Sequence, residues 1–148
     1  MTDRTLVEKK LALIVSAVSD LRRLARLEVM RHDVREERFI EHTLQLAVQA
    51  ALDVASHIVS DESLGEPETN RELFDLLARA AWISPELAGH LSRMAGFRNV
   101  LVHGYDDVDL AVVEDIVRHR LDDMLQFVTV VNQRLTHDRR GAGDPSRG

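Results

Sequence analysis

The chain has no cysteine among its 148 residues. Disulfide bonds, thiolate catalysis and cysteine-ligated zinc are therefore excluded, and the composition fits the cytoplasm, where disulfides are rare. No stretch approaches the roughly 20 apolar residues that cross a bilayer, and the N-terminal segment lacks the basic and apolar regions of a signal peptide. We therefore expect a cytoplasmic protein that does not interact with membranes.

Aromatic residues and positive charge are also scarce. Aromatic residues make up 4% of the sequence, which is too few for a base-stacking platform across a sheet. The 19 Lys and Arg residues are outnumbered by 25 Asp and Glu residues, which gives a formal net charge of −6. A basic footprint over the whole surface is thus excluded, and any contact with nucleic acid must use a local patch.

The hydrophobic pattern is helical throughout. The sequence has three prolines, and no hairpin dipeptide lies between alternating strands. We predict an all-α fold, an antiparallel up-and-down bundle of about five helices over residues 1–136. Residues 137–148 have nothing to bury, and we expect them to form a disordered tail. The expected helices cover about residues 4–30, 34–60, 70–81, 85–103 and 107–136.

Capping residues mark the expected helix starts. Asp33 and Thr69 each precede a glutamate by three residues, which is the pattern of a capping box. Ser84 stands before a first-turn proline and can cap the fourth helix. Asp106 or Asp107 can cap the last helix.

Arg98 stands where the helical pattern demands an apolar side chain. The core-facing series of the fourth helix advances in steps of three and four residues. It runs through Leu87, Leu91, Met94, Arg98, Leu101 and Tyr105. An isolated buried charge is very costly, so the guanidinium needs a partner. That partner can be an anionic ligand or a carboxylate of the chain, such as Asp53 or Glu41.

A neighbouring strip of the same helix carries small or polar side chains. Its members are Gly89, Ser92, Gly96, Asn99 and His103. A glycine inside a helix costs roughly 1 kcal/mol relative to alanine, so two glycines on one strip indicate that another surface approaches closely. We expect this strip to lie at a twofold homodimer interface.

Two other groups of polar residues are open to more than one interpretation. The second helix carries Glu41, Gln45, Gln49, Asp53 and His57 at four-residue steps. We favour an exposed polar stripe, and the alternative is a cleft lining in which Gln49 and Asp53 support the site. The seven histidines are dispersed without the spacing of a zinc helix, so we expect no metal site and no cofactor.

Four polar residues lie within eight positions at the end of the fourth helix: Arg98, Asn99, His103 and Tyr105. Each has a structural explanation when taken alone. Arg98 could form an ion pair, His103 could be a helix C-terminal cation, and Tyr105 could be a half-buried core residue. Taken together, they can hold a phosphodiester and move protons, because arginine binds phosphate as a fork and histidine titrates near neutral pH.

The string FRNVLVHGY carries Arg98, His103 and Tyr105 in the spacing Arg-x4-His-x-Tyr. It resembles the motif of the HEPN (higher eukaryotes and prokaryotes nucleotide-binding) superfamily. With the following DDVDL and flanks from about residue 35 to residue 127, it is similar to the HepT-like branch. The resemblance implies an all-helical homodimer that acts as a metal-independent endoribonuclease toxin of a type II or type VII toxin–antitoxin system.

The resemblance also implies partners and residue roles. Arg98 and His103 would be the catalytic pair, with Asn99 in support, and RNA would be the substrate. The partner would be a minimal nucleotidyltransferase antitoxin that adds AMP to Tyr105. Two alternatives stay open: a non-catalytic helical module that binds a nucleotide or a protein and partners a nucleotidyltransferase, and a purely structural bundle.

Overall fold

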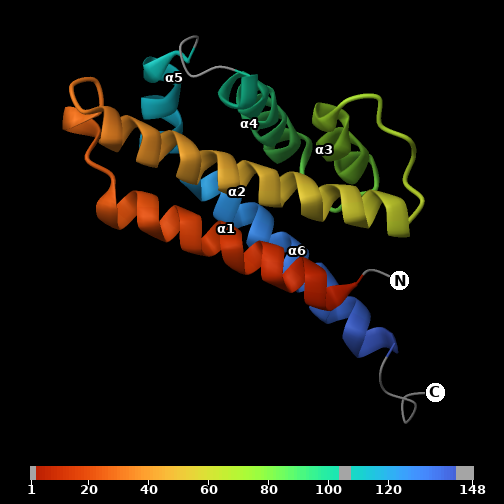
Figure 1. Cartoon of the computed structure of the whole chain (residues 1–148). Helices are drawn as coiled ribbons and strands as arrows, with labels where there is room; N and C mark the ends of the chain where they lie inside the picture. The colour runs from red at the N-terminus through yellow and green to blue at the C-terminus, as the bar shows by residue number, and fades with distance from the viewer. Residues whose placement is uncertain (1–2, 104–107, 143–148) are drawn as a thin grey trace.

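The computed structural model describes residues 3–103 and 108–142, with side chains over residues 3–100 and 108–137 (Figure 1). These residues form helices, and no strand occurs among them, so the predicted all-α class is confirmed. The elements in chain order are α1 (Arg4–Leu24), the 3-10 turn η1 (Leu27–Val29), α2 (Val34–Asp61), α3 (Asn70–Arg79), α4 (Pro85–His103), α5 (Leu110–Asp115), the π-helical turn η3 (Ile116–Arg120) and α6 (Leu121–Ala142).

Local capping sets the starts of the middle helices, as the sequence predicts. The carboxylate of Asp33 accepts hydrogen bonds from the first-turn N–H groups of α2. The hydroxyl of Thr69 accepts the N–H of Glu72 at the start of α3, and Ser84 Oγ accepts the N–H of Leu87 at 3.1 Å. These bonds satisfy N–H groups that have no partner within the helix.

The cap of the last helical segment differs from the prediction. The carboxylate of Asp109 accepts the N–H of Ala111 at 2.9 Å, so α5 starts two residues later than a cap at Asp107 would place it. Asp106 and Asp107 themselves lie outside the described residues. The chain offers several aspartates in a row here, and the sequence alone does not distinguish which one caps.

The first helix is shorter than predicted. It ends at Leu24, where Ala25 takes an extended conformation with φ −68° and ψ 130°. The side chain of Glu36 on α2 accepts the N–H of Arg26, and Met30 is buried, with 1% of its surface exposed. A carboxylate from another helix and a buried methionine thus hold the chain in a turn where the apolar spacing alone predicts continued helix.

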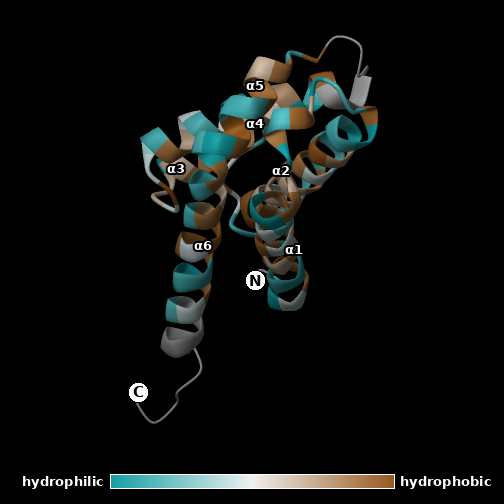
Figure 2. Ribbon diagram, turned by 90° about the vertical axis from the view of Figure 1, so that its left-hand side faces the viewer, coloured by the Kyte–Doolittle hydropathy of each residue, from teal (hydrophilic) through white to brown (hydrophobic). Residues whose placement is uncertain are grey.

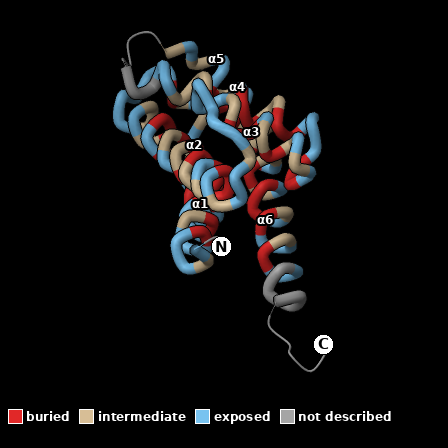
Figure 3. Tube along the Cα trace, turned by 90° about the vertical axis from the view of Figure 1, so that its right-hand side faces the viewer, coloured by how far each residue is buried: buried red, intermediate tan, exposed pale blue. Residues whose placement is uncertain are grey.

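The long helices lie side by side and enclose the core. α1 and α2 run antiparallel, α6 packs along α1, and α3 and α4 form a pair against α2 (Figure 1). Apolar and polar residues alternate around these helices (Figure 2), and the buried positions lie on their inward sides (Figure 3). The rings of Phe74 on α3 and Phe127 on α6 meet edge to face at 5.9 Å in this core.

A π-helical turn realigns the last helical segment. The three- and four-residue spacing of Leu110, Val113 and Val117 predicts that these residues face the core, but the structure buries Ile116 and leaves Val117 half-buried. The next buried residue is Leu121, which is five positions after Ile116. A π-helical turn accommodates this five-residue step, since its hydrogen bonds join residues five apart. The sequence alone does not predict this five-residue step.

The described part of α6 continues to Ala142, beyond residue 136, where we placed the end of the bundle. The rest of the proposed tail lies outside the described residues. None of the helices over the described ranges combines the length and apolar character needed to cross a bilayer.

Candidate functional site

α4 carries the polar motif on a helix that is anchored by its apolar side. Leu87, Leu91 and Met94 are buried in the core, as the predicted series requires. One turn further along, Arg98 is half-buried, and its Nε atom is buried without a hydrogen-bond partner. The helix therefore presents a guanidinium at the margin of the core, where an unsatisfied N–H is costly.

Asn99 is the hydrogen-bond partner of Arg98 that the structure describes. A terminal nitrogen of Arg98 donates to Asn99 Oδ1 at 3.2 Å. This bond ties down one edge of the guanidinium and leaves the other N–H groups available. His103 is the last residue of α4, as predicted, but its side chain and all of Tyr105 lie outside the described residues.

The structural ion pair considered for Arg98 is absent among the described side chains. Asp53 binds Lys10 on α1, with Nζ and Oδ2 3.0 Å apart, and Glu41 pairs with Arg38 at 3.5 Å. Neither carboxylate contacts Arg98. Of the two partners that the sequence leaves open, an anionic ligand is therefore the one that the described geometry favours.

The polar row of α2 is not an exposed stripe, so the interpretation that we favoured was wrong. Glu41 is fully buried, and the other four members of the row are half-buried. The row faces the start of α1, because His57 Nε2 accepts the N–H of Asp3 at 3.0 Å and Asp53 binds Lys10.

Gln49 joins the same contacts by donating to Asp53 Oδ1 at 2.8 Å. These bonds give Gln49 and Asp53 partners on α2 and α1, and neither has a described contact with Arg98. Their supporting role in the site stays a prediction.

Burial raises the pKa of Glu41 to about 7, and the nearby charge of Glu37 adds to this effect. The Arg38 guanidinium acts in the opposite direction. A carboxyl group without exposed surface favours its neutral form, since desolvation penalises the charge. Glu41 is consequently half-protonated near neutral pH.

The small-residue strip of α4 faces α3 over part of its length. Ser92 is buried, and its hydroxyl donates to the carbonyl of Arg71 at 3.0 Å. A Cβ on Gly96 would lie 3.6 Å from the Arg71 side chain, whereas one on Gly89 would meet nothing within 4 Å. The neighbour of Gly96 is thus a side chain of the same chain at an ordinary contact distance, and Gly96 does not itself indicate a homodimer.

A groove that the sequence analysis missed lies beside the motif, between α4 and the α5–η3 segment. It has a volume of about 160 Å³. Its lining residues are His90, Arg93, Met94, Phe97, Val112, Asp115, Ile116 and Arg120. Arg93 and Phe97 are four residues apart on α4, which is a detectable signal for a shared face, but their partners on η3 depend on the π-helical turn.

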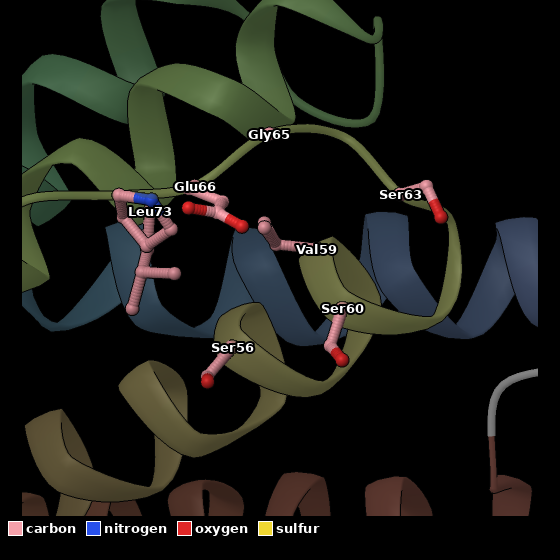
Figure 4. A pocket seen from close by; sticks show the side chains of 8 residues that line it. Ser56, Val59, Ser60, Ser63, Gly65, Glu66 and Leu73 are labelled. Atoms are coloured by element: carbon pink, nitrogen blue, oxygen red, sulfur yellow. The ribbon is translucent and has the colours of Figure 1, made fainter.

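A larger pocket lies at the far end of α2, under the loop before α3 (Figure 4). It has a volume of about 440 Å³ and is lined by Ser56, Val59, Ser60, Ser63, Gly65, Glu66, Pro67 and Leu73. Glu66 is the charged residue of this lining, and a carboxylate repels phosphate. The larger pocket is therefore a poor site for a nucleic-acid backbone.

No cluster of three or more His, Asp or Glu side chains suited to a metal ion occurs among the residues that the structure describes. The described polar side chains of the motif are the guanidinium of Arg98 and the amide of Asn99, whose N–H groups can bind an anion.

A family model described as Ribonuclease HepT-like matches residues 8–131. The chain belongs to this HepT-like ribonuclease family. It is 39% identical over 88 residues to the mRNA nuclease HepT of Shewanella oneidensis, a match that covers 60% of the chain and 66% of that relative. It is 31% identical over 132 residues to the tRNA nuclease HepT of Aphanizomenon flos-aquae, covering 88% and 90%. The predicted recognition and the RNA endonuclease class are confirmed at the level of the family.

Solved structures, two of them toxin–antitoxin complexes, share the fold. A toxin–antitoxin complex with AMP-PNP has a TM-score of 0.83 at 28% identity, covering 88% of this chain and 99% of that one. The tri-AMPylated Shewanella oneidensis HEPN toxin in complex with its MNT antitoxin has a TM-score of 0.81 at 30% identity, covering 90% and 99%. The cytosolic protein YutE of Bacillus subtilis has a TM-score of 0.84 at 15% identity, covering 97% and 95%, which shows a common fold alone.

Proposed function

We propose that this chain is an endoribonuclease toxin of a type II or type VII toxin–antitoxin system, and that it cleaves RNA without a metal ion. The observation that carries the proposal is the half-buried guanidinium of Arg98, which has no carboxylate partner among the described side chains and an unbonded Nε. A phosphate supplies the missing acceptors, because arginine binds phosphate as a two-pronged donor. The nuclease names of the relatives support the same function.

The reaction that fits these groups is an attack within the RNA chain. The 2′-hydroxyl loses its proton and bonds to the adjacent phosphorus, and the 5′-oxygen leaves with a proton, so that a 2′,3′-cyclic phosphate forms. His103 transfers a proton, Arg98 stabilises the charge on the phosphorane, and Asn99 holds the guanidinium in place. One histidine cannot easily serve both sides of the phosphorus, so we assign the second to a partner copy in a homodimer.

We further propose that a minimal nucleotidyltransferase antitoxin silences the toxin by adding AMP to Tyr105. The AMPylated toxin among the structural neighbours supports this step. An AMP group two residues from His103 would place an anion beside the site. That anion would compete with the RNA phosphate for the guanidinium and repel the RNA backbone.

Variants of the two catalytic residues test the function. His103→Ala and Arg98→Ala should each lower the rate of RNA cleavage by roughly 10²- to 10⁴-fold, measured with purified protein in EDTA. Arg98→Lys should fail to restore the rate, because an ammonium lacks the planar fork. Arg79→Ala, at an exposed position on α3, is the matched control and should cleave at the wild-type rate.

The outcomes separate this function from the alternatives. Full activity in His103→Ala, or an absolute need for Mg²⁺, would refute the mechanism. RNA or nucleotide binding without cleavage by the wild type would indicate the non-catalytic module. If Arg98→Ala unfolds the chain and the wild type neither binds nor cleaves RNA, the bundle is purely structural.

A further inference from the structure

The groove between α4 and the α5–η3 segment combines an apolar floor with a charged rim. Met94 and Ile116 are buried at its base, with 3% and 5% of their surface exposed. Phe97 is half-buried against the core beside them. A volume of about 160 Å³ is below the roughly 300 Å³ at which pockets begin to hold drug-sized ligands. The groove therefore suits one flat group, such as a single base, better than a whole small molecule.

The two arginines of the lining, Arg93 and Arg120, have N–H groups available to bind a ligand. Arg93 is exposed and has no hydrogen bond or ion pair among the described residues. Arg120 reaches a carboxylate only at 4.0 Å, that of Asp123, which His90 approaches more closely at 3.3 Å. The lining itself holds one carboxylate, Asp115. In a chain of net charge −6, these two guanidinium groups supply local positive charge of the kind that RNA binding requires, and Asp115 and Asp123 offset part of it.

The groove adjoins the proposed catalytic residues along α4. Phe97 directly precedes Arg98, and Met94 lies one helical turn before it. Four residues of α-helix span roughly 6 Å, so a group in the groove and a phosphate on Arg98 can belong to neighbouring nucleotides of one strand.

The π-helical turn explains why Arg120 reaches the groove. η3 spans Ile116–Arg120 and places both ends of the turn in the lining. π-helical turns are rare and occur frequently at functional sites. The other arginine on the same turn, Arg118, instead pairs with Glu114 at 3.2 Å and is absent from the lining.

We propose that this groove is a subsite for one unpaired nucleotide of the RNA substrate, next to the phosphate that is cleaved. The base enters against Phe97 and Met94, and Arg93 and Arg120 bind the phosphate of that nucleotide. A base must leave its stack to enter, so the subsite selects single-stranded RNA over duplex. The inference rests on the proposed ribonuclease function and identifies the substrate as an unpaired segment.

Binding of an uncleavable RNA tests the subsite separately from catalysis. The probe is a fluorescent single-stranded oligoribonucleotide with 2′-O-methyl groups at every position, and the readout is anisotropy of the full chain. The double variant R93Q/R120Q should bind roughly fivefold to tenfold more weakly than the wild type. The control R118Q should bind within about twofold of the wild type. A duplex of the same sequence should bind weakly to the wild type and to the double variant alike.

Cleavage of the unmodified strand adds a kinetic readout. The double variant should raise KM and leave kcat within about twofold of the wild type, because the groove binds ground state and transition state alike. If the double variant is not helical by circular dichroism, R93Q alone replaces it, since Arg93 is exposed. That single variant should weaken binding roughly threefold.

Each outcome bears on one of the two proposals. If the wild type cleaves RNA and the double variant binds the probe as tightly as the wild type does, the subsite is wrong and the function stands. If the wild type binds the probe in this groove without cleaving RNA, the function fails and the subsite stands. Loss of antitoxin binding with unchanged RNA binding would make the groove a protein contact and overturn the inference.

Discussion

At the scale of single residues, Arg98 interrupts the apolar pattern of α4. The sequence places it in an apolar series, and the structure leaves it half-buried with an unbonded Nε. An apolar side chain at this position would extend the buried series of Leu87, Leu91 and Met94. Retaining arginine there costs stability and is explained if an anion completes its hydrogen bonds.

Tyr105 is the residue at which regulation can be separated from catalysis. Tyr105→Phe removes the acceptor oxygen for AMP and keeps the ring. The variant should fold, cleave RNA at least in part, and escape silencing. The measurement is intact mass after coexpression with a minimal nucleotidyltransferase as the proposed antitoxin, where the wild type should gain one or more AMP units and the variant none. Equal labelling of the variant, or full activity of labelled wild type, would contradict the switch.

At the scale of helices, the fully buried Glu41 on α2 makes the free energy of unfolding of the chain depend on pH. Its folded pKa is about 7, against 4.5 for the ordinary carboxyl group. Between these values the folded chain holds a proton that the unfolded chain has released, so stability falls as pH rises through this window. Above about pH 7 the loss is complete and should be about 1–3 kcal/mol.

Glu41→Gln should remove this dependence. By urea unfolding, the variant should match the wild type near pH 4 and exceed its stability by about 1–3 kcal/mol at pH 8. Glu8→Gln, at an exposed position on α1, is the control and should show no such gain. Equal stability of Glu41→Gln and wild type at pH 8 would show that the Arg38 pair offsets the burial.

The helices also show which features a sequence reveals. Asp33, Thr69 and Ser84 cap their helices as predicted because a cap joins residues two or three apart. The predicted end of α1 was wrong because the N–H of Arg26 donates to Glu36, which lies on another helix. The polar row of α2 was misinterpreted for the same reason, since its partners lie on another element, Lys10 on α1 and Asp3 at the N-cap of α1.

At the scale of the whole molecule, the motif and the groove were not equally predictable. The motif lies within eight consecutive residues, so spacing and resemblance find it. The groove needs α4 and η3 together, and the π-helical turn that joins them breaks the regular period from which helical faces are predicted. Net charge predicts that an RNA site must be local, without saying where.

The homodimer stays a prediction, and its basis has changed. A Cβ added to Gly96 would meet the Arg71 side chain of the same chain, whereas one added to Gly89 would meet open space. Val100 follows Asn99 near the end of α4 and exposes 39% of its surface. An interface across the end of α4 would cover Val100 and bring two copies of the motif together. Val100→Asp should therefore give a monomer by sedimentation at micromolar concentration. Leu24→Asp, at another exposed apolar position, on α1, is the control and should leave the dimer intact.

Mixed dimers test whether the two copies share one site. Subunits carrying His103→Ala should be inactive alone, because their dimer lacks both histidines. After mixing with wild-type subunits and exchange, dimers with one of each subunit hold a single His103. If the two histidines serve one site, these dimers should be nearly inactive, since the acid and the base each need a histidine. About half of the wild-type rate in these mixed dimers, or a wild type that sediments as a monomer and cleaves RNA fully, would show that each chain works alone.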